Sequence, residues 1–234
     1  MKPLIRWTLG GNVSSDGIEI LNQSIFLISK NYPEVDTIVC HNGVEKGHLQ
    51  KIKADLYKQF HDPEMEYPPR AEMWKMYPPR LRPEAHEIVL DNDVLIFSKI
   101  QEIDMFLSGN YTLMLRGRAR AYGGYDHKVP QPHAINSGLY GLPPNFDLAS
   151  KIKDCCKEDE TRAWLKWCDD QGVIAYSLFQ GNHIIIEPDV ILNYFPEYTD
   201  PLPTGLKGVH FQGLNAGKRQ NWKSLIEPFT RRLL

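Results

Sequence analysis

The stretch EIVLDNDVLI, residues 87–96, decides the fold class of this 234-residue chain. Four residues typical of a buried strand lead into two carboxylates, Asp91 and Asp93, that are one residue apart, and apolar residues then resume. At the carboxyl end of a parallel strand, both side chains would point into the crevice where α/β sheets bind ligands. Two hard oxygen ligands at that place suit Mg²⁺ or Mn²⁺, which complete their shell with substrate phosphates. The alternative is a solvated turn.

Short apolar runs alternate with stretches of helical period, which is the pattern of an α/β protein with a mainly parallel sheet. The expected strands are 4–9, 37–40, 87–90, 111–115, 134–141 and 183–186. The expected helices are 18–30, with Asp16 as N-cap and Tyr32-Pro33 as its end, 44–60, and 159–179, with a break near Gly172. No stretch has the composition of a flexible linker, so we expect one domain.

Composition excludes several classes of protein. Hydrophobic residues make up 42% of the chain and charged residues 24%, as in an ordinary globular protein, and the formal net charge of -2 disfavours a nucleic-acid partner. The four cysteines are irregularly spaced and form no CxxC pair, so we expect reduced thiols. The N-terminus turns polar too early for a signal peptide or a membrane span. We therefore expect a cytoplasmic location.

The strand followed by Asp-Asn-Asp resembles the D-x-D motif of GT-A glycosyltransferases, whose acidic pair binds the cation and the ribose or diphosphate of the donor. Three further segments occur in that family's order, above all that of its glycogenin and lipopolysaccharide galactosyltransferase branch: AINSGLYG at 134–141, CDDQGV at 168–173 and GVHFQGLNAGK at 208–218. The resemblance implies a single Rossmann-like, mainly parallel mixed sheet flanked by helices. Its parts would be a nucleotide-binding half, an acceptor and sugar half, and a C-terminal helix or tail, at 1–100, 101–217 and 218–234.

The first of these segments is similar to the family's N-S-G segment, which lines the sugar pocket. Asn136 and Ser137 can hydrogen-bond sugar hydroxyls, and Gly138 would let a ligand approach the backbone. The alternative is a strand end that happens to carry a glycine.

The second segment is similar to the family's acidic-Gln segment before a helix, so Gln171 would line the donor site. Asp169 or Asp170 could cap that helix, act as general base on the acceptor hydroxyl in an inverting enzyme, or orient the sugar in a retaining one. Asp170 is the preferred catalytic candidate.

The third segment resembles the family's closing H-F-x-G motif with a lysine after it. The resemblance implies that His210 binds the same cation as the two carboxylates, that Gly213 permits a tight loop, and that Lys218 places charge on the leaving diphosphate. The sequence departs from the common form because the lysine comes late and Arg219 follows it, so either cation could take that role.

The nucleotide contacts are also implied by the resemblance. The loop after the first strand, with Leu9, Gly10 and Asn12, and the end of the second strand at His41 would contact the base and ribose, and Asn92 would lie beside them. A basic residue before the acidic pair would reach the nucleotide, and Lys75 is the candidate, with Arg80 and Arg82 as competitors.

The expected activity is hexosyl transfer from a nucleoside-diphosphate donor, UDP by family frequency, to a hydroxyl of a glycan, a lipid-linked glycan or a protein. Basic loop 115–125 could meet phosphate or sugar, or be solvated. Residues 218–234 suit either peripheral contact with an anionic membrane at its inner face or a helix packed on the domain. The competing functions are a haloacid-dehalogenase-like phosphatase using Asp91 and Asp93 and a non-catalytic nucleotide- or carbohydrate-binding protein.

Overall fold

The main sheet of the protein is mixed and mainly parallel. The computed structural model describes residues 1–10, 13–58, 76, 80–130, 132–157, 168–195, 198, 200–212 and 226–229. Within these residues, the sheet has the strand order β3-β2-β1-β4-β7-β6-β8. The bounds are β1 Leu4–Gly10, β2 Asp36–Asn42, β3 Asp55–Lys58, β4 Glu87–Leu90, β6 Thr112–Arg116, β7 Ile135–Leu142 and β8 His183–Ile186. Strand β7 runs antiparallel to both its neighbours, β4 and β6, and the other pairs are parallel.

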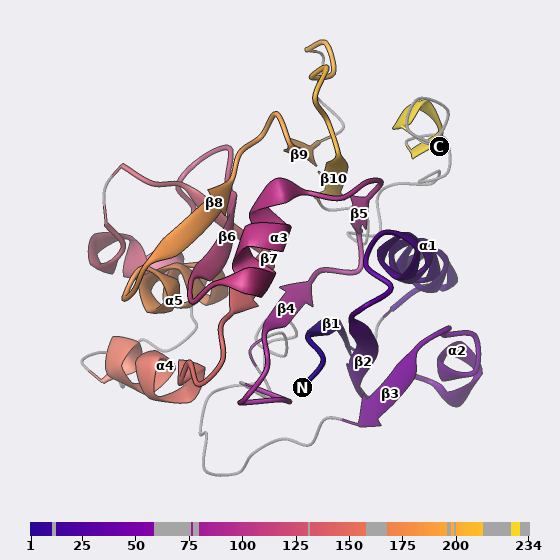
Figure 1. The fold of residues 1–234 in the computed structure, drawn as a ribbon, viewed down its shortest axis with the longest axis horizontal. Coiled ribbons are helices and arrows are strands. Elements are labelled where there is room, and N and C mark those ends of the chain that lie inside the picture. The colour runs from indigo at the N-terminus through magenta and orange to yellow at the C-terminus, as the bar shows by residue number, and fades with distance from the viewer. Residues whose placement is uncertain are drawn as a thin grey trace.

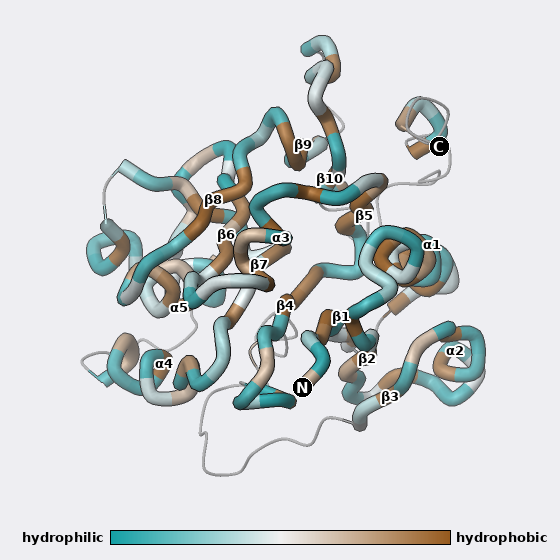
Figure 2. The backbone as a smooth tube through the Cα atoms, in the orientation of Figure 1, coloured by the Kyte–Doolittle hydropathy of each residue, from teal (hydrophilic) through white to brown (hydrophobic). Residues whose placement is uncertain are grey.

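Helices cover both faces of this sheet (Figure 1). Their bounds are α1 Ser15–Asn31, α2 Lys46–Leu49, α3 Gln101–Ser108, α4 Leu148–Cys156 and α5 Asp169–Leu178, with a 3-10 helix, η2, at Gly123–Lys128. Ile88 and Leu90 of β4 share a core with α1 and α3, whereas Val89 shares one with α4 and α5. Because β4 is covered on both faces, its sequence is a continuous apolar run, and Figure 2 shows hydrophobic residues along the central strands.

A second, smaller sheet stands at the carboxyl edge of the first. It consists of β5 Val94–Ile96, β9 Ile191–Tyr194 and β10 Gly208–Phe211, in the order β5-β10-β9. Strand β10 is antiparallel to β5 and parallel to β9. Since β5 starts directly after Asp93, the acidic pair lies on the connection between the two sheets.

The described part of the C-terminal segment packs on the protein itself. Residues 226–229 form a helical turn, and the Phe229 ring lies edge-on to Phe211 of β10, with 5.4 Å between ring centroids. Ile226 and Phe229 are both buried in the core formed with α1 and the small sheet. The rest of 218–234 lies outside the described residues. Among the described helices, none has both the length and the apolar composition needed to cross a membrane.

Three expectations about helices were wrong. Residues 44–60 contain only the four-residue α2 and then the edge strand β3, up to the described limit at residue 58. Helix α1 is capped by the side chain of Ser14, which accepts a hydrogen bond from the Gly17 amide at 3.0 Å, and Asp16 lies in its first turn. Helix α5 continues through Gly172, where a Cβ would lie 2.5 Å from the Tyr122 carbonyl oxygen. This glycine therefore permits close packing of α5 on η2.

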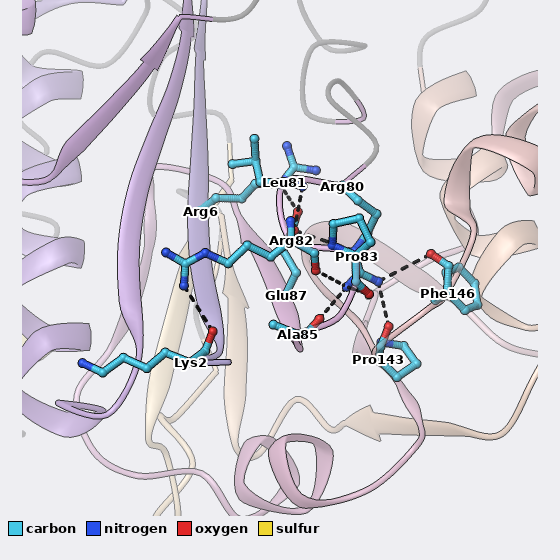
Figure 3. A network of polar contacts seen from close by, with 10 residues as sticks. All are labelled: Lys2, Arg6, Arg80, Leu81, Arg82, Pro83, Ala85, Glu87, Pro143 and Phe146. Carbon is cyan, nitrogen blue, oxygen red and sulfur yellow. Dashed lines mark hydrogen bonds and ion pairs between the residues drawn. The ribbon is translucent and has the colours of Figure 1, made fainter.

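A buried ion network anchors the amino end of β4 (Figure 3). The fully buried Glu87 carboxylate lies 2.7 Å from Arg6 Nε and 3.7 Å from Arg80 Nε. It also accepts hydrogen bonds from the backbone amides of Leu81 and Arg82 at 2.9 and 3.2 Å. These groups lie at the opposite end of β4 from the acidic pair, so the network holds the fold and not a ligand at that pair.

This placement bears on the two arginines expected to compete for the nucleotide. Arg80 donates to the carbonyls of Pro143 and Ala85, and Arg82 pairs with Asp36 at 2.6 Å. Both guanidinium groups are held at the amino end of β4, so this structure does not place either beside the acidic pair. The other candidate, Lys75, lies outside the described residues.

Candidate metal and donor site

The acidic pair occupies a short turn that is hydrogen-bonded to three neighbouring elements. The Asp91 amide donates to the Gly138 carbonyl at 2.8 Å, which extends the pairing of β4 with β7. The Asn92 side chain donates to the Gly17 carbonyl in α1 at 3.3 Å. The Asp93 carbonyl accepts from the Phe211 amide of β10 at 3.0 Å. The turn is therefore fixed before any ligand binds, which the alternative of a freely solvated turn does not predict.

His210 of β10 faces this turn from the small sheet. Its Nε2 lies 3.4 Å from Asp93 Oδ1 and 3.7 Å from Asp91 Oδ2. The side chains of His210 and Asp93 are 6% and 9% exposed, and that of Asp91 is 27% exposed. Asp91 therefore forms the open side of the cluster, from which a ligand can enter.

The three side chains fit a divalent cation. Their ligand atoms all lie within 4.8 Å of one another. Neighbouring ligands on Mg²⁺ at about 2.1 Å in octahedral geometry are about 3.0 Å apart, so the two separations from His210 Nε2, 3.4 and 3.7 Å, would need to close by several tenths of an ångström. Two carboxylates and one imidazole also suit Mn²⁺, and two buried or half-buried carboxylates without a cation would repel each other.

The N-S-G segment forms an irregularity in β7. The pairing of β7 with β6 shifts register between Met114 and Leu115, so Ser137 and Gly138 fall in the part of β7 that has no partner in β6. Such bulges redirect side chains next to binding sites. Asn136 Oδ1 accepts from the Gly138 amide at 2.7 Å, which closes the bulge.

Gly138 makes room for the ring of His210. A Cβ at this position would lie 2.3 Å from Cε1 and 2.8 Å from Nδ1 of His210. The space that a side chain would fill is therefore occupied by the imidazole ring. The glycine is required because the histidine from the other sheet packs directly against β7.

The acidic-Gln segment starts α5 and connects it to β7 and to η2. Asp169 Oδ1 accepts from the Gly124 amide at 2.7 Å. Gln171 Oε1 accepts from the Ser137 amide at 3.1 Å, and its Nε2 donates to the Ala121 carbonyl at 2.8 Å. These bonds hold the loop before η2 against the bulge, so Asp169 and Gln171 both support the shape of the site. Asp170 is also buried in the first turn of α5.

The basic loop is largely structural. Arg116 makes a two-pronged contact with Glu187 at 2.8 and 3.0 Å, and this hydrogen-bonded pairing raises the pKa of Arg116. Arg120 pairs with Asp126 and donates to loop carbonyls. Tyr122 and Tyr125 are buried. Of the loop's three arginines, Arg118 is the exposed one, and it lies over the ring of Phe195.

The other expected donor residues are placed only in part. Leu9, Gly10 and His41 lie at the carboxyl ends of β1 and β2, where Leu9 pairs with His41 in register. That is the edge of the sheet to which the acidic pair also belongs. Asn12, Lys75, Gly213 and Lys218 lie outside the described residues.

No role for Asn193, which contacts His210, was expected from the sequence. This asparagine is buried in β9, and its Oδ1 lies 3.2 Å from His210 Nδ1. A polar residue within the apolar stretch ILNY at 191–194 was the available signal, but β9 itself was not among the expected strands.

These observations define the class of fold: a mixed α/β sheet whose fourth strand ends in a D-x-D turn that meets a histidine from a second small sheet. Comparison with solved structures agrees. The galactosyltransferase LgtC, solved with donor and acceptor sugar analogs, is similar with a TM-score of 0.60 and 13% identity, over 90% of this chain and 87% of that chain. An active-site mutant of LgtC has a TM-score of 0.56 and 12% identity over the same shares. The protein thus has the GT-A glycosyltransferase fold, as the resemblance implied.

A third similar structure is longer than this chain. It is the apo form of the glycosyltransferase GlyE from Streptococcus pneumoniae TIGR4, with a TM-score of 0.53 and 12% identity, over 82% of this chain and 47% of that chain. No protein-family model and no curated protein sequence matches the chain. At these identities the likeness defines the fold, and the activity has to be argued from the site.

Proposed function

We propose that this protein is a metal-dependent glycosyltransferase that moves a sugar from a nucleoside-diphosphate donor to a hydroxyl acceptor. The observation that carries the proposal is the convergence of Asp91, Asp93 and His210 from two sheets on one point of a GT-A fold. Asp91 and Asp93 lie at the two ends of the turn between β4 and β5, and His210 comes from β10. The hydrogen bonds described above hold the turn against β7 and β10. Solvation of exposed acids does not require such an arrangement.

The chemistry needs stabilisation of negative charge above all. When the sugar leaves, charge develops on the departing diphosphate while the anomeric carbon becomes electron-poor. A divalent cation bound by the cluster supplies Lewis acidity toward the diphosphate oxygens. In this proposal the chain's own carboxylates hold that charge at the carboxyl edge of the sheet, and Leu9 and His41, at the same edge, contact the nucleoside. Lys218, or Arg219, would add positive charge on the same leaving group.

We assign the binding of the sugar to the β7 bulge, and the action on the acceptor or the orientation of the sugar to the start of α5. Asn136 and Ser137 lie on the bulge next to the His210 ring, so they are positioned to contact hydroxyls of a sugar bound at the cluster. Asp170 stays our candidate for the carboxylate that acts on the acceptor hydroxyl or orients the sugar. One of the similar LgtC structures carries an active-site substitution, and the other holds donor and acceptor sugar analogs.

UDP is the proposed nucleotide, and a glycan, lipid-linked glycan or protein hydroxyl is the proposed acceptor, in the cytoplasm or at its membrane face. The phosphatase alternative is weaker because β1, β2 and β3 all precede the strand that carries the acidic pair, whereas that class has its pair on the first strand. The His210 contact also has no part in a mechanism with an aspartate nucleophile.

The test is isothermal titration of UDP, GDP and related nucleotides, with and without Mn²⁺, on the wild type and on Asp93→Ala. Asp154→Ala is the matched control, because it removes an exposed carboxylate of α4 that pairs with Lys157, away from the cluster. The expected result is Mn²⁺-dependent binding of one nucleoside diphosphate that is lost in Asp93→Ala and kept in Asp154→Ala. Absence of nucleotide binding, together with Asp91-dependent hydrolysis of a generic phosphate ester, would overturn the proposal in favour of a phosphatase.

A further inference from the structure

A buried amide holds the ring of His210 from behind. Asn193 lies opposite His210 in the pairing of β9 with β10, and it is 5% exposed. Its Oδ1 is 3.2 Å from His210 Nδ1 and 3.3 Å from Gln212 Nε2. The Gln212 amide nitrogen can only donate, so the atom that faces both groups acts as an acceptor.

The orientation of the Asn193 amide is fixed by its other end. Its Nδ2 donates to the backbone carbonyl of Arg116 at 2.7 Å. A carbonyl oxygen cannot donate a hydrogen bond, so rotating the amide by half a turn would place two acceptors against each other. Asn193 therefore presents its oxygen to His210, and His210 Nδ1 has to carry the proton.

The tautomer of His210 follows from this contact. A neutral imidazole with its proton on Nδ1 has its lone pair on Nε2. Nε2 is the atom that faces Asp93 Oδ1 and Asp91 Oδ2 at 3.4 and 3.7 Å. Against the same ring lies Gly138, where even a methyl group would collide with Cε1. The ring is thus confined by an amide on its Nδ1 edge and by the backbone of β7.

We propose that Asn193 is a positioning residue that fixes the Nδ1–H tautomer of His210 and thereby keeps Nε2 available to a divalent cation. This inference rests on the proposed function, because it assigns the cation to the same cluster. Asn193 also joins the two sheets, since its amide bonds the carboxyl end of β6 through Arg116 and β10 through His210. The supporting residue comes from a strand that contributes no ligand of its own.

The experiment compares the wild type with Asn193→Leu, Asn193→Asp and Asn31→Leu. Leucine removes all three of these Asn193 hydrogen bonds, whereas aspartate keeps an acceptor for the Nδ1 proton. Asn31→Leu is the matched control, because Asn31 also donates its amide to a backbone carbonyl of the small sheet region, that of Ile96 at 3.0 Å, without contacting His210. Two readouts are needed: ¹H–¹⁵N correlation spectra of the His210 ring in alkaline buffer, and Mn²⁺ affinity by paramagnetic resonance.

The expected result is an Nδ1–H tautomer in the wild type, in Asn193→Asp and in Asn31→Leu, and a mixture of tautomers in Asn193→Leu. Mn²⁺ affinity should fall about 10- to 100-fold in Asn193→Leu, the usual effect of losing the partner of a ligating histidine, and stay unchanged in Asn31→Leu. An Nε2–H tautomer in the wild type would overturn the inference. So would Mn²⁺ binding that is equal in the wild type and in Asn193→Leu. A wild type that binds no Mn²⁺, with or without a nucleotide, would instead overturn the proposed function, whichever tautomer is found.

Discussion

Replacing Glu87 by glutamine tests whether the buried network at the amino end of β4 holds the central strand in place. The carboxylate is fully buried, and it faces two guanidinium groups and two backbone amides. Burial lowers the pKa of Arg6, but the charge of Glu87, together with contributions from Tyr140 and Cys40, outweighs this effect, so the pKa of Arg6 is raised overall. Removing the negative charge leaves Arg6 buried without compensation. The expected loss of stability is about 3–5 kcal/mol, the usual cost of breaking a buried ion pair on one side.

Of the two arginines that face Glu87, Arg6 depends more strongly on its charge than Arg80 does. Its Nε lies 2.7 Å from Glu87 Oε1, but at an angle that makes no hydrogen bond, and among the described residues its Nη1 and Nη2 have no hydrogen-bond partner. Arg80, in contrast, donates to several backbone carbonyls. We therefore expect the double variant Arg6→Met with Glu87→Leu to be more stable than Glu87→Gln alone, because it removes both members of the pair that depends on Glu87.

Urea unfolding followed by tryptophan fluorescence measures these differences, and the midpoint is compared at constant slope. Asp154→Asn serves as the control, because it neutralises an exposed carboxylate that forms a surface pair with Lys157. A loss of less than about 1 kcal/mol in Glu87→Gln, the level of an exposed pair, would refute the reasoning, since it would mean that the network contributes no more than a surface salt bridge.

Three further predictions concern single contacts. Gly138→Ala should displace the His210 ring and lower Mn²⁺ affinity at least about tenfold, at a stability cost of about 1–3 kcal/mol; titration and thermal melts check both. Asp169→Ala should cost about 1 kcal/mol by leaving the half-buried Gly124 amide without its Asp169 acceptor, measured by urea unfolding. Asp147→Ala should cost about 1 kcal/mol at neutral pH, because Asp147 caps α4 through the Ser150 amide. That bond lowers the pKa of Asp147, so its contribution is present above the unfolded-state pKa and is lost as pH falls through the folded value. Thermal melts should therefore separate the wild type from the alanine variant near pH 7, and this difference should shrink as the pH is lowered towards about 3.

The sequence predicted the central sheet well, for a physical reason. Strands covered on both faces need a run of apolar residues, and EIVL at 87–90 is such a run, so β4 and the turn after it were placed correctly. The same reasoning failed at 44–60. Leu56 and Tyr57 of the edge strand β3 are both substantially exposed, so neither a buried run nor a clear alternation marks this strand. Because an edge strand buries little of its surface, its sequence shows no strong pattern of apolar residues.

The site was predictable only as far as its ligands. Asp91 and Asp93 are adjacent to a strand, and His210 was proposed from a resemblance, but the residues that position them could not be found locally. Gly138 is required because of His210, which lies far along the chain, and Asn193 acts through the pairing of β9 with β10. Contacts of this kind are defined by the docking of one sheet against another, and no short motif contains that information.

The two sheets therefore share the site in a way that ties cation binding to the folding of the smaller one. Asp93 connects the turn after β4 to the small sheet by two contacts. Its backbone carbonyl accepts a hydrogen bond from the Phe211 amide of β10, and its carboxylate faces His210. Strand β5 follows Asp93 directly and pairs with β10, so the spacing between carboxylate and imidazole is set by the register of Val94 opposite His210. A change that loosens this pairing without touching a ligand should weaken cation binding as much as a change beside the cluster. Conversely, a cation bound by the proposed cluster should stabilise the docking of the small sheet on the main one, because His210 comes from β10 and Asp91 directly follows β4.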